Sequence, residues 1–176
     1  KAMEINGKAP GYLAEACKAA DALLVHYSTD FVFDGALQQP YRIDDRTNPL
    51  SAYGSSKLEG ERAIISGGCR LLIIRTSWLY GPHGRNFVEA ILVKAQKGEQ
   101  LKVVNDQVGR PTYTVDLSEA TLRLLDAQAR GIAHFANSGH CSWHEFAEEI
   151  VRQAGLSVSV EALSSAELGR PAQRPA

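Results

Sequence analysis

Ser28-Thr29-Asp30 and, beyond a loop, Ser51-Ala52-Tyr53-Gly54-Ser55-Ser56-Lys57 are the two segments that decide the fold. The apolar run 22–27 precedes the first segment and is bounded by polar residues, so it predicts a short buried strand. Open α/β sheets bind their ligands at the carboxyl ends of their strands. We therefore expect residues 28–30 to lie at the rim of a sheet, facing a ligand.

The second segment predicts the start of a helix, with Ser51 as its N-cap. Tyr53 and Lys57 are four residues apart and therefore share one face of that helix. An ammonium beside a phenol favours the phenolate and makes the tyrosine a better acid near neutral pH. Taken alone, the Tyr-x-x-x-Lys pattern favours an ordinary helix, in which Tyr53 packs on the core and Lys57 pairs with Glu61 on the surface. The strand that ends in Ser28-Thr29-Asp30 just upstream favours the site.

A second apolar run, 71–77, follows this helix and predicts another buried strand. The order strand, loop, Tyr-x-x-x-Lys helix, strand resembles the extended branch of the short-chain dehydrogenase/reductase superfamily, which acts on nucleotide sugars. Within that branch, segments 28–35, 75–81 and 106–112 resemble the dTDP-4-dehydrorhamnose reductase family. The resemblance covers essentially the whole chain. It implies an α/β fold: the C-terminal half of a Rossmann-like doubly wound parallel sheet, with a smaller α/β substrate-binding lobe.

The composition argues against several other classes of protein. The chain has 176 residues, of which 44% are hydrophobic and 22% charged, and its net charge is -1. This balance is typical of a globular domain, and the charge gives no reason to expect a nucleic-acid partner. No apolar stretch approaches the roughly 18 residues that a membrane span needs, so no membrane partner is expected. Three cysteines without a Cys-x-x-Cys pair suit a reducing cytoplasm, where we expect the protein.

The resemblance implies three catalytic residues: Thr29, Tyr53 and Lys57. In the family, the threonine hydroxyl hydrogen-bonds the substrate keto oxygen and the tyrosine protonates it. The lysine biases the phenol and holds the nicotinamide ribose. The implied cofactor is NADPH or NADH, and the residues implied to bind it are Ser28, Tyr53, Lys57, Thr76 and Ser77.

The resemblance also implies a substrate, a dTDP-sugar, and six residues that contact it: Asp30, Phe31, Trp78, Asn86, Gln107 and Arg110. The fork of an arginine matches the oxygens of a diphosphate. Trp78 is equally compatible with a core aromatic, and the segment 106–112 with a simple turn. Dehydratases of the same branch carry an Asp-Glu pair where this chain has Asp30-Phe31, so reduction is favoured over dehydration.

No glycine-rich phosphate loop occurs in the chain, although the family carries one near its amino terminus. We therefore expect a fragment that lacks the first half of its dinucleotide-binding sheet and that also ends early, at 170–176. Such a fragment should bind dinucleotide poorly and turn over nothing by itself.

The remaining segments predict further elements. Helices are expected up to about residue 20, with an early interruption at Pro10-Gly11, over 86–97 and 115–129, and after a capping box at 142–145. Strands are expected at 101–104, 132–137 and 158–160. Asn6 is either an exposed polar residue or, by the resemblance, one that holds water or a backbone kink near the catalytic pair. His140-Cys141-x-x-His144 offers too few ligands for structural zinc, so no metal site is predicted.

Two domains are expected. Residues 1–79 would be the second half of the NAD(P)-binding domain, and 80–176 mainly a substrate lobe, with 115–137 returning to the sheet. The function hypothesis is NADPH-dependent reduction of the 4-keto group of dTDP-4-dehydro-L-rhamnose to dTDP-L-rhamnose, by a monomer or homodimer, with Mg²⁺ optional. Two alternatives stay open: another nucleotide-sugar reductase or epimerase of the branch, and a non-catalytic NADP-binding regulatory subunit similar to the methionine adenosyltransferase beta subunit.

Overall fold

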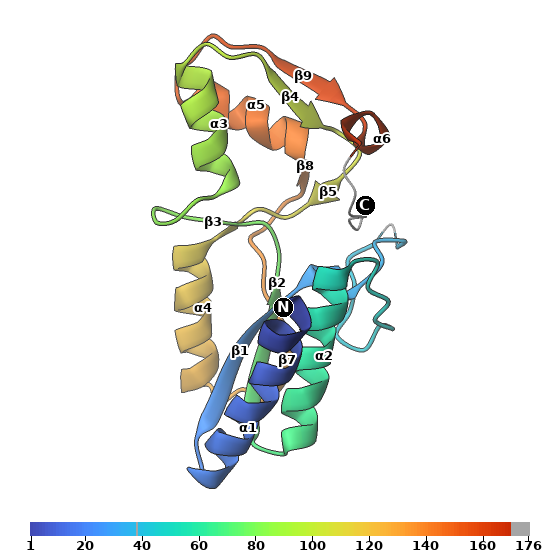
Figure 1. Ribbon diagram of the computed structural model, residues 1–176. Helices are drawn as coiled ribbons and strands as arrows, with labels where there is room; N and C mark the ends of the chain where they lie inside the picture. Colours follow the sequence, from blue (N-terminus) through green and yellow to red (C-terminus); the bar gives the residue numbers. More distant parts are fainter. Residues whose placement is uncertain (38, 170–176) are drawn as a thin grey trace. The chain divides into compact units, whose positions relative to one another are not determined.

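The computed structural model describes residues 1–37 and 39–169 (Figure 1). The chain folds into two compact units. The first consists of Lys1–Thr76 and Glu119–Phe135, and the second of Ser77–Ser118 and the described residues from 136 onward.

A parallel three-stranded sheet forms the centre of the first unit, in the order β1-β2-β7. Its strands are β1 (Leu23–Thr29), β2 (Arg70–Thr76) and β7 (Gly131–His134). The middle strand is buried on both faces, which explains its uninterrupted apolar sequence at 72–74. The α/β class and the parallel sheet predicted from the sequence are confirmed.

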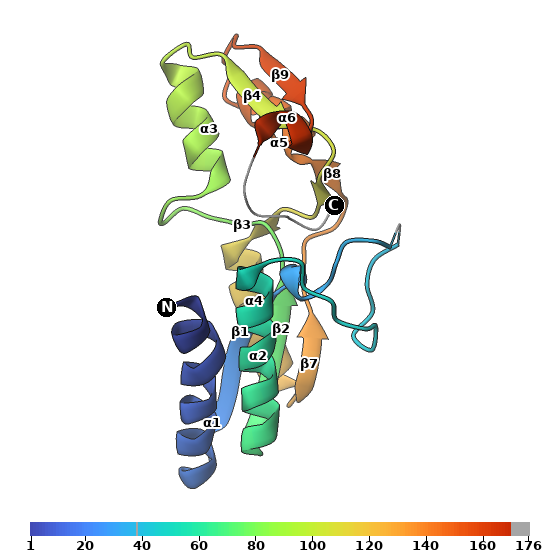
Figure 2. The same cartoon turned by 45° about the vertical axis from the view of Figure 1, so that its right-hand side comes forward.

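Helices cover both faces of this sheet. On one face α1 (Ala9–Ala19) and α2 (Ala52–Gly67) lie side by side (Figure 2). Ala14 and Ile64 of these helices pack on Ile73 of β2 and form a small core. The side chain of Tyr27 points to the other face, where its hydroxyl lies 2.9 Å from Thr121 Oγ1 in the later part of α4 (Thr114–Asp126).

The amino-terminal helix differs from its prediction at Pro10-Gly11. The expected interruption is wrong: the helix continues from a π-helical turn, η1 (Met3–Lys8), directly into α1. Pro10 is the second residue of α1 and follows directly on the π-helical turn η1, so the chain stays helical although the proline has no N–H to donate.

Among the described residues, the second unit contains three small two-stranded sheets. The parallel pairs are β3 (Leu79–Tyr80) with β6 (Thr112–Tyr113), and β4 (Leu101–Val104) with β9 (Val160–Leu163). The antiparallel pair is β5 (Val108–Gly109) with β8 (Cys141–Ser142). The helices are α3 (Phe87–Gln96), α5 (Trp143–Gln153), α6 (Ser165–Leu168) and the start of α4. A core of aliphatic residues lies between α3, α5 and β4 (Ile91, Ala95, Leu101, Val103, Ala147, Ile150 and Val151).

The predicted helix starts are confirmed by their caps. Ser51 Oγ accepts from Gly54 N at 3.1 Å, and Asn86 Oδ1 accepts from Glu89 N at 3.1 Å. Ser142 and Glu145 form the expected capping box. Two strand predictions need correction, because pairing partners, not local pattern, set the ends: 132–137 pairs only over β7, and 158–160 is replaced by β9. The segment 106–112, predicted as a loop, contains the short strand β5 and the start of β6.

Candidate functional site

Three of the predicted site residues, Thr29, Tyr53 and Lys57, lie together in the first unit. Thr29 is the last residue of β1, and Tyr53 and Lys57 are one turn apart near the start of α2. The side chain of Thr29 lies near enough to the Tyr53 phenol to influence its pKa. The Tyr53 side chain stays 47% exposed, so a ligand can reach it.

The start of α2 is held close to the end of β1 by backbone packing. Gly54 lies against the carbonyl of Phe31, so closely that a side chain at residue 54 would overlap that oxygen. Phe31 belongs to a short 3₁₀ turn, η2 (Asp30–Val32), that follows β1 directly. A glycine at this place therefore lets the helix bring Tyr53 against Thr29.

The pKa of Tyr53 is raised above its ordinary value, which corrects the expectation that Lys57 makes it a stronger acid. Burial is the main cause; the nearby Thr29 side chain acts in the opposite direction, and the Asp30 carboxylate adds a smaller increase. Tyr53 is therefore a neutral phenol at pH 7, with its proton available for donation.

The Lys57 ammonium binds β1. Its Nζ donates to the carbonyl oxygen of Tyr27 at 2.7 Å and lies 3.2 Å from His26 Nε2. Burial, followed by the charge of Lys57, lowers the pKa of His26 to about 4, so its ring is neutral at pH 7 and can accept from the ammonium. Burial also lowers the pKa of Lys57, against a smaller increase from Glu61. The alternative of a surface Lys57–Glu61 pair is wrong, because Glu61 is 1% exposed and pairs with Arg75.

Asp30 and Phe31, the predicted substrate residues of this unit, adjoin the same place. The Phe31 ring meets the Tyr53 ring edge to face, with centroids 5.7 Å apart. Thr29 Oγ1 donates to Asp30 Oδ1 at 3.1 Å and accepts from Phe31 N at 3.2 Å. Burial raises the pKa of Asp30 to about 6, and the hydrogen bond from Thr29 offsets only part of that effect.

The raised pKa of Asp30 predicts a stability that falls as pH rises. In the unfolded chain this carboxyl titrates near 3.8, so between about pH 4 and 6 the folded state binds more protons and loses stability with increasing pH. Asp30→Asn should remove this loss and stabilise the protein at pH 7 by up to about 3 kcal/mol, the equivalent of the pKa shift. Urea unfolding of both proteins at pH 4 and pH 7 measures it. Equal stability differences at the two pH values would contradict the prediction.

Two predicted cofactor residues of this unit differ in how their hydroxyls are used. Ser28 Oγ donates to the Glu61 carboxylate, so the side chain of Ser28 is engaged inside the protein. Thr76, at the end of β2, is 6% exposed, and its Oγ1 has no hydrogen-bond partner within the described residues. A buried hydroxyl without a partner costs free energy. A ligand that hydrogen-bonds Thr76 Oγ1 would remove this cost, whereas Ser28 Oγ already has its partner.

The other predicted residues lie in the second unit. Ser77 Oγ donates to the Arg110 carbonyl at 2.9 Å, and Gln107 Nε2 donates to Ser165 Oγ at 2.7 Å. Asn86 caps α3 and donates to the carbonyls of Gly81 and Gly84, so its amide is engaged in shaping the loop before α3. These contacts give the side chains of Ser77, Gln107 and Asn86 structural roles in this unit.

Trp78 stacks on Trp143, with ring centroids 3.5 Å apart and planes 9° apart. Gly109 lies against the same indole, and a side chain at residue 109 would overlap it. The backbone of Trp78 has a φ of 46°, a conformation that bulky residues rarely adopt. Backbone strain of this kind is often found at functional sites. Trp78 therefore packs on Trp143 and also contacts the 106–112 segment at Gly109.

Sequence reasoning missed His26, Glu61 and Arg75. A signal for Arg75 existed: a charged residue that continues the apolar run 71–74 must find a buried partner. Asn6 is near the site without reaching it, since its Nδ2 donates to Ser56 Oγ at 3.1 Å. In the described part of the chain no group of three or more His, Cys, Asp or Glu side chains could hold a metal ion. Among the described helices, none is long and apolar enough to cross a bilayer.

Comparisons with known proteins point in one direction. The family model described as the RmlD substrate binding domain matches residues 1–176. The spore coat polysaccharide biosynthesis protein SpsK of Bacillus subtilis is 46% identical over 176 residues, which are 100% of this chain and 62% of that protein. A dTDP-4-dehydrorhamnose reductase of Sinorhizobium fredii is 42% identical over 187 residues, covering 100% of this chain and 63% of its own length.

A solved structure gives the same result for the fold. The dTDP-4-dehydrorhamnose reductase of Bacillus anthracis, in complex with NADP, superimposes with a TM-score of 0.94 at 38% identity. The match covers 97% of this chain and 60% of that one. The chain thus spans about three fifths of the length of the relatives that it matches.

Proposed function

Because the chain belongs to the RmlD substrate-binding domain family, we propose that the complete protein that carries it is an NADPH-dependent dTDP-4-dehydrorhamnose reductase. It would reduce the 4-keto group of dTDP-4-dehydro-L-rhamnose and release dTDP-L-rhamnose. The observation that carries this proposal is the cluster of Thr29, Tyr53 and Lys57 at the junction of β1 and α2. Their side chains supply a hydrogen-bond donor, a neutral phenol and a cation to one place.

The residues present fit a nicotinamide cofactor. An ammonium has three N–H donors. Lys57 uses two of them, on the Tyr27 carbonyl and on His26, which leaves the third for a ribose hydroxyl. The buried Thr76 hydroxyl would gain a partner from a bound group. We propose that Tyr53, Lys57 and Thr76 hold the cofactor through side chains. Ser28 and Ser77, whose hydroxyls are engaged, would contribute through their backbone.

The cofactor, when bound, supplies a hydride to the keto carbon. Negative charge then develops on the keto oxygen, where the Thr29 hydroxyl, which donates to Asp30 in this structure, would turn to donate a hydrogen bond. Tyr53 would transfer its phenolic proton to that oxygen and complete the alcohol. Since the pKa of Tyr53 is raised, the phenol enters the reaction protonated.

The domain organisation of the chain is also part of the proposal. Residues 1–79 would form the second half of the NAD(P)-binding domain. Residues 80–176 would form mainly the substrate lobe, with 115–137 returning to the sheet. The residues proposed to contact the nucleotide sugar are Asp30, Phe31, Trp78, Asn86, Gln107 and Arg110. A cytoplasmic location, a monomeric or homodimeric assembly and an optional Mg²⁺ complete the proposal.

The test is NADPH oxidation by the full-length protein, with dTDP-4-dehydro-L-rhamnose generated by the upstream epimerase. The reaction should require the sugar and yield dTDP-L-rhamnose, and parallel assays with EDTA and with NADH test the metal and the cofactor preference. Oxidation only with other keto-sugar nucleotides would replace the substrate. A protein that binds NADPH but oxidises it with none of them would be a regulatory subunit, and the reductase proposal would fail.

A further inference from the structure

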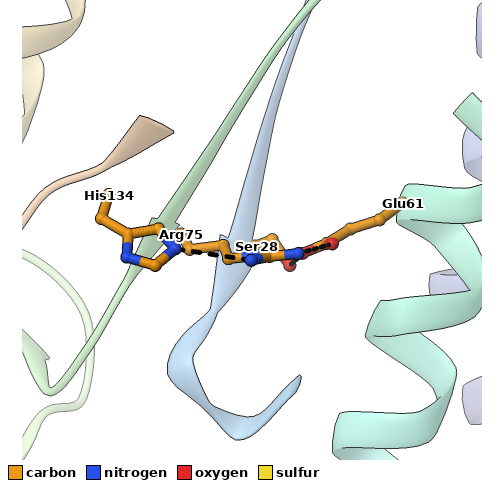
Figure 3. A network of polar contacts seen from close by, with 4 residues as sticks. All are labelled: Ser28, Glu61, Arg75 and His134. Atoms are coloured by element: carbon orange, nitrogen blue, oxygen red, sulfur yellow. Dashed lines mark hydrogen bonds and ion pairs between the residues drawn. The ribbon is translucent and has the colours of Figure 1, made fainter. Parts of the chain in front are cut away.

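A buried ion pair joins α2 to β2 one helical turn beyond Lys57. Glu61 and Arg75 are 1% and 5% exposed. Arg75 donates twice to the Glu61 carboxylate, from Nη2 to Oε2 at 2.7 Å and from Nε to Oε1 at 3.0 Å. Ser28 Oγ of β1 donates to the same carboxylate. Figure 3 shows these side chains in one row with His134 of β7, whose Nε2 lies 3.4 Å from Arg75 Nη1.

These four residues, the Glu61 network, connect α2 with all three strands of the sheet. The pKa of His134 is lowered by burial and then by the charge of Arg75, so its ring is neutral at pH 7 and can accept the Arg75 N–H. The Arg75 guanidinium also lies over the Phe33 ring, 5.1 Å from its centroid. The network thus fixes α2 against β1, β2 and β7 at one level of the sheet.

Stability alone does not explain such a network. Removing two charges from water costs about as much as their attraction returns, and apolar replacements of similar volume are often neutral or stabilising. What an ion pair with a bidentate geometry adds is a unique register between the elements that it joins. The position of the Glu61 network indicates that the register concerned is that of α2 against β1.

The network lies directly beneath the candidate site. Ser28 stands between Tyr27, whose carbonyl accepts from Lys57, and Thr29, whose hydroxyl meets Tyr53. On α2, Glu61 is one turn after Lys57 and two turns after Tyr53, on the same face. The bond from Ser28 to Glu61 therefore ties the end of β1 to the face of α2 that carries Tyr53 and Lys57.

We propose that Glu61 and Arg75, through Ser28, are positioning residues that set the distance from Thr29 to Tyr53 and Lys57. This proposal rests on the proposed reduction, and it assigns no contact with substrate or cofactor to Glu61 or Arg75. Without the network, α2 can shift along β1 while the apolar core of the sheet keeps the unit folded. Displacements of about 1 Å at reacting groups can cost about 100-fold in rate.

The test is the double variant Glu61→Leu/Arg75→Met in the full-length protein, with Ser28→Ala as a milder second variant. For the double variant we expect kcat to fall about 100-fold while KM for the sugar changes less than about threefold. Ser28→Ala should lower kcat about fivefold. The matched control is Glu149→Leu/Arg152→Met, which removes a bidentate Arg–Glu pair of the same type from the surface of α5, with no expected change in kcat.

A second measurement reports position without turnover: the nuclear Overhauser effect between the Thr29 methyl group and the Tyr53 ring protons. It should weaken in both network variants and persist in the control. A folded double variant that keeps kcat within twofold and this signal intact overturns the proposal. If the double variant does not fold, Ser28→Ala decides by the same criteria. If the wild-type protein reduces no sugar, the proposed function fails, and the Overhauser signal alone decides the positioning role.

Discussion

Tyr53→Phe lowers kcat for the proposed reduction about 1000-fold, while the Kd for NADPH stays within about threefold of the wild-type value. The phenol is the proposed proton donor, and a positioned general acid contributes about 100- to 10,000-fold. Phenylalanine keeps the ring that packs edge to face on Phe31, and it leaves Lys57 bound to β1. The loss should therefore fall on the chemical step and not on cofactor binding.

Steady-state NADPH oxidation and equilibrium NADPH binding measure the two quantities on the same full-length protein. Tyr12→Phe is the matched control, because Tyr12 lies on α1 with 66% of its side chain exposed. This control should retain the wild-type kcat. A Tyr53→Phe protein with kcat within threefold of wild type would remove Tyr53 from the role of acid, whatever the reaction proves to be.

Gly60→Ala destabilises the protein by about 3 kcal/mol, opposite in sign to what helix propensity predicts. In an exposed helix interior the same change stabilises by about 1 kcal/mol. Gly60 is buried in the middle of α2, and a Cβ there would overlap the carbonyl oxygen of Asn6 in η1. That oxygen belongs to the backbone of a neighbouring helix, so it cannot rotate away. The helix η1 must move as a whole, and the bond from Asn6 to Ser56 is lost with it.

Urea unfolding at pH 7 measures the change in the free energy of unfolding. The control is Ser66→Ala, at an exposed position of the same helix, where we expect a change within about 0.5 kcal/mol. Stabilisation by Gly60→Ala would show that η1 adjusts freely. In that case the close approach of η1 to α2 would not explain the glycine at residue 60.

The sequence predicted the elements whose signals are local. The polar residues at the carboxyl end of β1, the cap at Ser51 and the capping box at Ser142 each depend on a few neighbouring residues, and each lies in the predicted place, although β1 extends through Ser28 and Thr29. The shared face of Tyr53 and Lys57 on α2 follows from their four-residue spacing in the same way. Family resemblance supplied the proposed roles of these residues, which spacing alone could not.

The parts that escaped prediction depend on contacts between distant segments. Nothing local to Glu61 indicates that its partner is Arg75, and without that pairing Lys57–Glu61 was the natural surface pair. The direction of the pKa shift of Tyr53 depends on burial that only the packed unit shows. The π-helical turn η1 has no simple residue pattern, and the two-residue strands β5 and β8 exist only because they pair with each other.

The stack of Trp78 on Trp143 gives the chain an optical property. The chain contains two tryptophans, and both are in this stack, so all of its indole fluorescence comes from a single coupled pair. Two nearly parallel rings 3.5 Å apart share their electronic excitation, and their emission reports on the pair and not on either ring. A change in tryptophan emission from this chain therefore reports one event, the separation of Trp78, just after β2, from Trp143 at the start of α5. No added label is needed.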